Sequence, residues 1–232
     1  MRGTVGVLTL CAVCLCGIAP AEDAFQQVLQ KADAAYANRD FEQCLPDYAI
    51  VLKGYEKQSN LFPEKQVTVF MNQDASESRV KNSPLNEYRI IHFASHGLID
   101  EERPQFSALV LSPGDSREDG FLTMREVFDL KLNADLVVLS ACKSGLGKRV
   151  RGEGLAGLSM AFFSAGTSNM VVSLWNVYDA STADFMAAFY KNLRKSNATR
   201  ASALREPRLQ MIRGGKFGHP YYWAPFILIG AD

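Results

Sequence analysis

The chain has three histidines and five cysteines, and among these His92, His96 and Cys142 lie in or close after apolar runs where they could do nucleophilic or metal chemistry. Both of these histidines lie in the stretch "IIHFASHGLID", which is β-rich and interrupted by glycine. On a strand they would share a face but stand roughly 13 Å apart, at about 3.3 Å per residue, so they cannot share a metal ion. His92 lies inside the apolar run and fits a hydrogen-bonded core residue, whereas His96 lies at the carboxyl end, where open α/β sheets place their chemistry.

Cys142 follows directly on a second apolar run, "DLVVLS". If the two runs are neighbouring parallel strands, Cys142 and His96 reach the same edge of a sheet, as a nucleophile and its proton acceptor. Nearby basic residues, among them Lys143 and Lys148, favour the thiolate form of the cysteine. Gly97 allows close backbone approach, so its N–H and that of Cys142 could form an oxyanion hole. A buried, unreactive cysteine remains the alternative.

Short apolar runs alternate with helical patterns after Pro63, which predicts an α/β domain with a largely parallel sheet and helices on both sides. The predicted strands span residues 66–70, 88–95, 108–112, 135–140, 170–175 and 226–229, and the predicted helices span 75–80, 123–130, 154–165, 182–193 and 201–212.

Composition and motifs exclude several other functions. The 232 residues are 47% hydrophobic and carry 25 basic and 25 acidic side chains, so a nucleic-acid partner is not expected. The stretch "GLGKR" fails the phosphate-loop pattern at Cys142 and Arg149, and "GLSMA" lacks the second glycine of a serine hydrolase elbow.

The N-terminus has the layout of a secretory signal over residues 1–21: an early basic residue, an apolar run and a small-residue site at Ala19 to Ala21. Cleavage there would give a secreted or periplasmic protein with no stable membrane span. An uncut segment would leave the chain membrane-anchored or cytoplasmic. Residues 22–57 are expected to form a helix pair that resembles one tetratricopeptide unit, which would bind a protein partner, or else an unspecialised hairpin.

Four blocks, in order, resemble the CHAT family, caspase-like cysteine peptidases of clan CD that are often attached to tetratricopeptide repeats. They are "HFASHG", "DLVVLSACKSGLG", "GEGLAGLSMAFFSAGTSNMVVSLWNVYD" and "HPYYWAPFILIG". The resemblance implies a caspase-like three-layer α/β/α sandwich with a mostly parallel sheet over residues 61–232. It also implies peptide-bond hydrolysis without metal or cofactor. Cys142 would be the nucleophile, His96 would carry the proton, and the N–H groups of Gly97 and Cys142 would donate to the oxyanion.

The chain departs from the family pattern in two places. The stretch ahead of the histidine block is short, which predicts a domain shortened on its N-terminal side with an inner strand absent. Pro207 is expected to kink or split the last long helix. A non-enzymatic scaffold that binds a partner through the helical repeat is therefore the alternative function.

Three residues are candidates for substrate binding. Ser140 occupies a position where related peptidases carry an acid that selects basic side chains. The stretch "SLWNVYD" resembles a region of separases that carries acidic residues after the tryptophan. The first of those positions is Asn176 in this chain, whereas Asp179 still supplies a carboxylate. Asp179 would pair with an arginine or lysine of the substrate, or it would serve as an acidic residue at a helix start.

Overall fold

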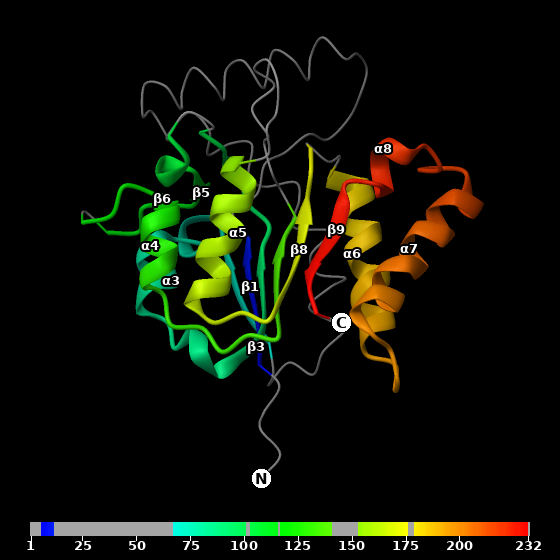
Figure 1. Cartoon of the computed structure of the whole chain (residues 1–232), viewed down its shortest axis with the longest axis horizontal. Helices are drawn as coiled ribbons and strands as arrows, with labels where there is room; N and C mark the ends of the chain where they lie inside the picture. The colour runs from blue at the N-terminus through cyan, green and yellow to red at the C-terminus, as the bar shows by residue number, and fades with distance from the viewer. Residues whose placement is uncertain are drawn as a thin grey trace.

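A six-stranded sheet forms the centre of the molecule in the computed structural model, which describes residues 6–11, 67–100, 103–115, 117–140, 153–175 and 179–231 (Figure 1). The strand order is β2-β1-β3-β7-β8-β9, and β9 alone runs antiparallel to its neighbour. The strands are β1 (Gly6–Cys11), β2 (Val67–Met71), β3 (Tyr88–Phe93), β7 (Leu136–Leu139), β8 (Asn169–Ser173) and β9 (Phe226–Gly230).

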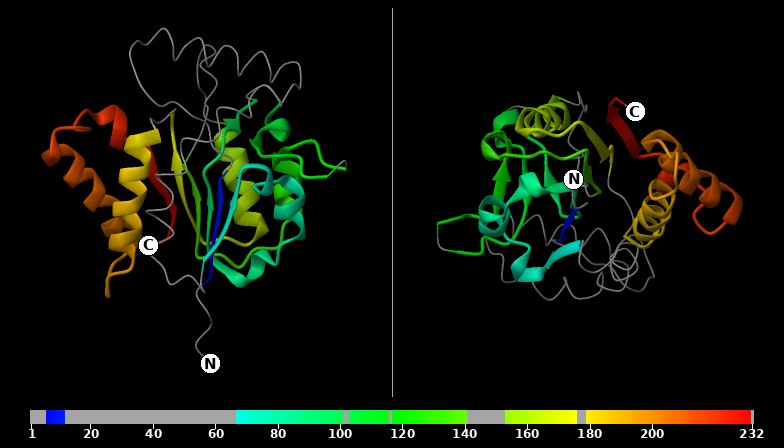
Figure 2. Two further views of the ribbon diagram at one scale, coloured as in Figure 1. Left: turned by 180° about the vertical axis from the view of Figure 1, so that it is seen from behind. Right: turned by 90° about the horizontal axis from the view of Figure 1, so that it is seen from below.

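Helices cover both faces of this sheet, as Figures 1 and 2 show. In β3, Ile91 packs into the core shared with α5 (Glu153–Ala165), whereas Ile90 packs into the core shared with α6 (Asp179–Leu193). This alternation is what a strand buried on both faces requires. The remaining helices are α3 (Glu77–Asn82), α4 (Met124–Asp129), α7 (Arg200–Gly214) and α8 (Pro220–Trp223).

A separate antiparallel sheet follows β3 and was not predicted. It consists of β4 (Gly97–Leu98), β5 (Ala108–Val110) and β6 (Phe121–Thr123) in that order. The residues expected to form one strand over 108–112 therefore form β5 in this sheet. Two-residue and three-residue strands carry too few side chains for an alternating pattern to reveal them.

The position of β1 differs from the sequence prediction. Residues 6–11 lie inside the predicted signal, yet they pair in parallel with both β2 and β3. The expectation of an absent inner strand is therefore wrong, because β1 fills that place. A short apolar, β-branched run suits a buried strand as well as it suits the core of a secretory signal, so the sequence pattern cannot separate the two.

Removal of residues 1–21 tests the role of β1. Without β1, the backbone groups of β2 and β3 that pair with it lose their partners, which is costly away from water. We expect the shortened chain to melt at least about 10 °C lower than the full chain, or to lose its cooperative transition, in a calorimetric scan.

A chain that lacks residues 1–5 is the matched control, because it keeps all six residues of β1. Equal melting temperatures for the full chain and the chain without residues 1–21 would contradict the inner position of β1. Such a result would favour cleavage of residues 1–21 as a signal. Mass spectrometry of the mature protein measures that cleavage directly.

Helix α7 continues through Pro207, so of the predicted kink or split, the split is wrong and the kink stays a prediction. Pro207 lacks the N–H that would bond to the carbonyl of Ala203. It is buried on one stripe with Ala203, Leu204 and Met211, and packing of that stripe in the core beside α6 offsets the lost bond.

The predicted α/β class is confirmed, since a mostly parallel sheet lies between two helical layers, an architecture compatible with a caspase-like fold. The tetratricopeptide-like pair at 22–57 falls outside the described residues. Within the described ranges, the helices are too short or too polar to cross a membrane.

Candidate active site

The carboxyl ends of β3, β7 and β8 lie side by side in the sheet. Phe93 pairs with Leu139, and Leu139 pairs in turn with Val172. Just past the ends of β3 and β7, the N–H of Ser140 donates to the carbonyl of Phe93 at 3.1 Å. His96 comes three residues after Phe93 and Cys142 two residues after Ser140, so both chain segments leave the sheet from the same edge.

His96 stands between β3 and β4 with a partly exposed side chain. Burial lowers the pKa of its imidazole below the ordinary value of 6.5. A lowered pKa keeps the ring neutral near pH 7, which is the form that accepts a proton from a thiol.

Gly97 is buried, and its N–H points away from the small sheet. The carbonyl of His96 accepts the N–H of Val110 at 2.8 Å, and the peptide bond between His96 and Gly97 is trans. In a trans peptide the C=O and N–H point in opposite directions, so the Gly97 N–H faces away from β5. This donor is therefore not used by the β4–β5 ladder, as an oxyanion donor requires.

Ser140 is buried with 1% of its surface exposed, and its hydroxyl lies 2.8 Å from Nε2 of His92. The other ring nitrogen of His92, Nδ1, lies 3.0 Å from the hydroxyl of Tyr190 on α6. His92 is thus a hydrogen-bonded core histidine, as predicted, and neither nitrogen is available to a metal. The Ser140 side chain is directed into this network, so substrate binding by Ser140 stays a prediction.

The other predicted site residues are only partly placed. Cys142 and Asn176 lie outside the described residues, so the structure does not test the pairing of Cys142 with His96. Asp179 is the first residue of α6, three residues earlier than the predicted helix start, where a negative charge is favourable. The preceding Trp175 donates its indole N–H to the carbonyl of Tyr221 at 3.1 Å and so ties this edge to α8.

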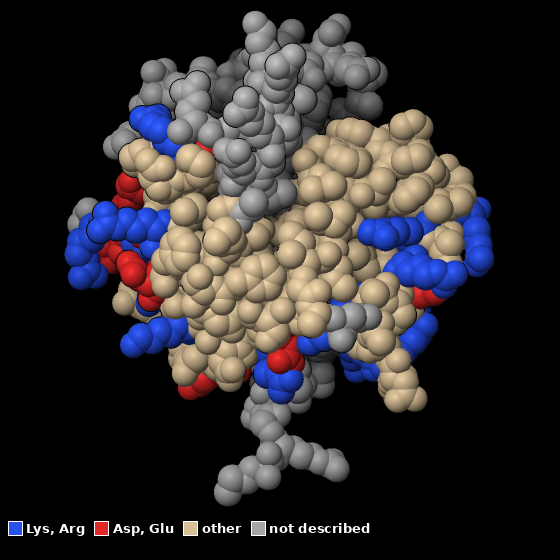
Figure 3. Space-filling view, viewed as in Figure 1, with Lys and Arg blue, Asp and Glu red and all other residues tan. Residues whose placement is uncertain are grey.

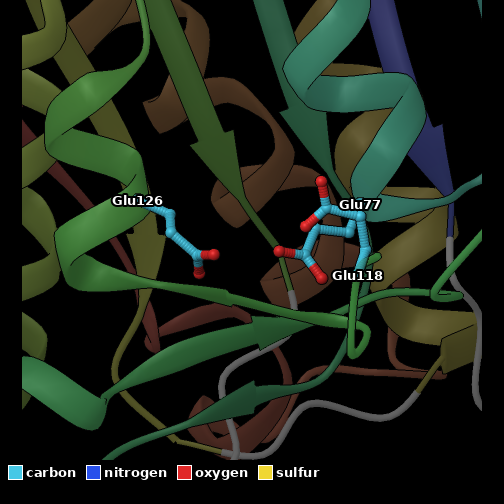
Figure 4. Close-up of side chains that lie close together, drawn as sticks. All are labelled: Glu77, Glu118 and Glu126. Atoms are coloured by element: carbon cyan, nitrogen blue, oxygen red, sulfur yellow. The ribbon is translucent and has the colours of Figure 1, made fainter. Parts of the chain in front are cut away.

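A cluster of three glutamates, which no sequence motif indicated, has carboxylate oxygens within 4.8 Å of one another. Glu77 comes from α3, Glu118 from the loop before β6 and Glu126 from α4, and Figure 4 shows how they gather. The ammonium of Lys81 lies 2.7 Å from Glu77, 2.5 Å from Glu118 and 2.7 Å from Glu126. Lys81 thus supplies the positive charge that a metal ion would otherwise bring.

The pKa values of this cluster reflect burial and the hydrogen bonds among its members. Burial raises the pKa of Glu77, against hydrogen bonds from Lys81 and the Gly120 N–H. Burial alone would lower the pKa of Lys81, but its bonds to the three glutamates outweigh burial and hold that pKa above its ordinary value. Lys81 therefore remains charged and links α3, α4 and the loop before β6.

Replacing Lys81 by methionine should lower the free energy of unfolding by about 3 kcal/mol, because three close carboxylates lose their common counterion. Urea denaturation at pH 7 measures the change. Lys131→Met is the control, since Lys131 is exposed on the surface. We further expect calcium to raise the melting temperature of Lys81→Met and not that of the wild type. Equal stability of the two lysine variants would contradict the role of Lys81.

The chain is similar to a known domain family and to two known proteins. The family model described as "CHAT domain" matches residues 15–231. The protein named "Tetratricopeptide repeat protein 28" from Mus musculus is 40% identical over 112 residues, and its counterpart from Homo sapiens is 39% identical. The match covers 48% of this chain and 4% of each relative. The chain belongs to the CHAT domain family.

Proposed function

We propose that this chain is a cysteine endopeptidase that uses Cys142 and His96 as a dyad. His96 takes the thiol proton, and the Cys142 sulfur attacks the peptide carbonyl carbon while the N–H groups of Gly97 and Cys142 stabilise the oxyanion. The C–N bond then breaks, and His96 passes its proton to the leaving amine. Water, deprotonated by His96, hydrolyses the thioester and releases the second product.

The observation that carries this proposal is the shared edge of β3 and β7. The backbone bond between Phe93 and Ser140 fixes the two strand ends together, and only a few residues lead from them to His96 and Cys142. Chain lengths of two and three residues span at most about 7 and 11 Å, which allows the two side chains to meet. The lowered pKa of His96 and the direction of the Gly97 N–H, away from the β4–β5 ladder, add to this support.

A positional-scanning peptide library tests the function. The purified chain should cleave a defined subset of peptides, whereas Cys142→Ala at the same concentration should cleave none. Cleavage by both proteins would identify a contaminating peptidase and remove the support for the proposal. Absence of cleavage by the wild type across the library would also count against it.

We propose that Asp179 selects arginine or lysine at the cleaved bond and that Asn176 also contributes to substrate binding. A carboxylate at this edge can bind a guanidinium through two hydrogen bonds. We expect Asp179→Asn to reduce kcat/KM for substrates with a basic residue by about tenfold or more and to leave apolar substrates unchanged. Unaltered basic selectivity in Asp179→Asn would assign the carboxylate to the start of α6 alone.

A non-enzymatic scaffold is the second candidate. It is favoured by the names of the matched relatives, which refer to tetratricopeptide repeats and to no activity. In this role residues 22–57 would hold a protein partner, and Cys142 would be dispensable. Capture of the same partner by wild type and Cys142→Ala, together with no cleavage in the library, would support the scaffold.

A further inference from the structure

Charge is unevenly distributed along this neutral chain. Residues 180–231 contain eight Lys or Arg and two Asp or Glu, so this part has an excess of six positive charges. The two acidic residues are Asp184 and Glu206, and Glu206 is paired with Arg205 at 3.1 Å. Figure 3 shows blue side chains gathered over the α7 side of the molecule, with little red between them.

Six of these basic side chains are exposed: Lys191, Arg194, Lys195, Arg205, Arg213 and Lys216. They lie at the end of α6, on α7 and just after it. Clustered like charges repel one another, so such a face is stabilised by an anionic partner.

An apolar pocket opens between α6 and α7 within this basic face. It has a volume of about 180 Å³. Its apolar lining includes Phe185, Pro207, Met211 and Phe217, and its polar lining includes Asp184, Gln210 and Lys216, so an inserted side chain must be uncharged. This volume is smaller than small-molecule sites of roughly 300–1,000 Å³ and suits one inserted apolar side chain. Lys216 also lies over the ring of Phe217, 4.8 Å from its centroid, which places a positive charge beside the pocket.

We infer that the α6–α7 face binds an acidic peptide segment of a protein partner that inserts one apolar side chain into this pocket. The surrounding lysines and arginines pair with the acidic residues on either side of the inserted one. This inference does not depend on the proposed peptidase activity, because it uses none of the residues at the edge of β3 and β7.

An acidic peptide fits these observations better than other polyanions. A phosphate backbone or a lipid headgroup would satisfy the basic side chains but would leave the apolar pocket unfilled. A peptide supplies both parts, since acidic and apolar side chains alternate freely along it. Polyanions without an apolar side chain therefore serve as comparison ligands.

Fluorescence anisotropy tests the inference with the full chain carrying Cys142→Ala, so that cleavage does not interfere. The probe is a labelled peptide of about twelve Glu and Asp residues with Leu-Phe at its centre, beside the same peptide with Ala-Ala. Lys216→Glu combined with Arg213→Glu should weaken binding at least tenfold. Arg117→Glu, at an exposed arginine before β6, is the matched control and should change it less than twofold.

Gly214→Leu tests the pocket separately. Gly214 lines the pocket, and a Cβ added there meets no heavy atom within 4 Å, so a leucine at this position is expected to narrow the pocket without disturbing the fold. It should lower the affinity for the Leu-Phe peptide at least tenfold and leave the weaker Ala-Ala peptide unchanged. Melting temperatures check that each variant is folded, and Lys216→Gln with Arg213→Gln replaces the charge reversal if that variant is not.

Three results would overturn the inference. One is equal affinity for the Leu-Phe and Ala-Ala peptides, and another is an equal loss in Arg117→Glu. The third is binding of single-stranded RNA or of phosphatidylserine vesicles as tight as that of the Leu-Phe peptide, which would assign the face to phosphate groups.

Discussion

Replacing Cys142 by alanine or His96 by alanine should each reduce kcat/KM for a cleaved peptide by at least about a thousandfold. The two side chains act as one unit in the proposed mechanism, since a thiol without its base attacks slowly and a base without a thiol has nothing to activate. The double variant should therefore be hardly slower than either single one. Steady-state kinetics with the best library substrate measure all three.

Two controls keep this result specific. Far-ultraviolet circular dichroism should be unchanged in each variant, because His96 lies in a short connection between β3 and β4. His219→Ala changes an exposed histidine far along the chain and should keep activity within about twofold of the wild type. Full activity in Cys142→Ala, or multiplicative losses in the double variant, would show that the two residues do not work together.

Among single side chains, His92 has the largest expected effect on stability. Burial lowers the pKa of its imidazole to about 3 in the folded chain, against an ordinary value of 6.5. Between these pH values the unfolded chain binds a proton at this position that the folded chain does not, so stability falls as pH falls. The contribution of His92 is fully present above pH 6.5 and is lost toward pH 3, at about 1.4 kcal/mol per pH unit and roughly 5 kcal/mol in all.

Urea denaturation of wild type and His92→Gln across this pH range measures that effect. Glutamine has a donor and an acceptor for Ser140 and Tyr190 but does not titrate. The stability advantage of the wild type should shrink, and then reverse, as pH falls from 6.5, because only the wild type has a titrating side chain at position 92. The carboxylates and His96 titrate in both proteins, so their effects cancel in the difference. His219→Asn is the control. Parallel stability curves for wild type and His92→Gln would contradict the buried neutral state of His92.

Most strands of the main sheet could be predicted because they are rich in apolar and β-branched residues. "YRIIHF", "DLVVLS" and "NMVVSLW" became β3, β7 and β8 within a few residues of the predicted limits. The same pattern failed at β1, where an apolar run at the N-terminus also fits a secretory signal. It failed at β4 and β6 because those strands are too short to show a period.

The candidate site was predictable only as far as strand order allowed. His96 and Cys142 could be placed after neighbouring strands from a single parallel crossover connection. That step needs no knowledge of side-chain packing. The partners of His92 lie 48 and 98 residues away along the chain, and Lys81 reaches glutamates 37 and 45 residues away. Pairings of this kind depend on how helices pack on the sheet, which residue spacing does not encode.

The most direct test of the central claim is the mass of the intact chain after reaction with a peptidyl acyloxymethyl ketone, which alkylates an activated cysteine. The account predicts one adduct, located on Cys142 by peptide mapping, formed by the wild type and slowed at least a hundredfold in His96→Ala. Cys44→Ser should react at the wild-type rate. No adduct on Cys142, or equal rates in the wild type and His96→Ala, would contradict a Cys142–His96 dyad.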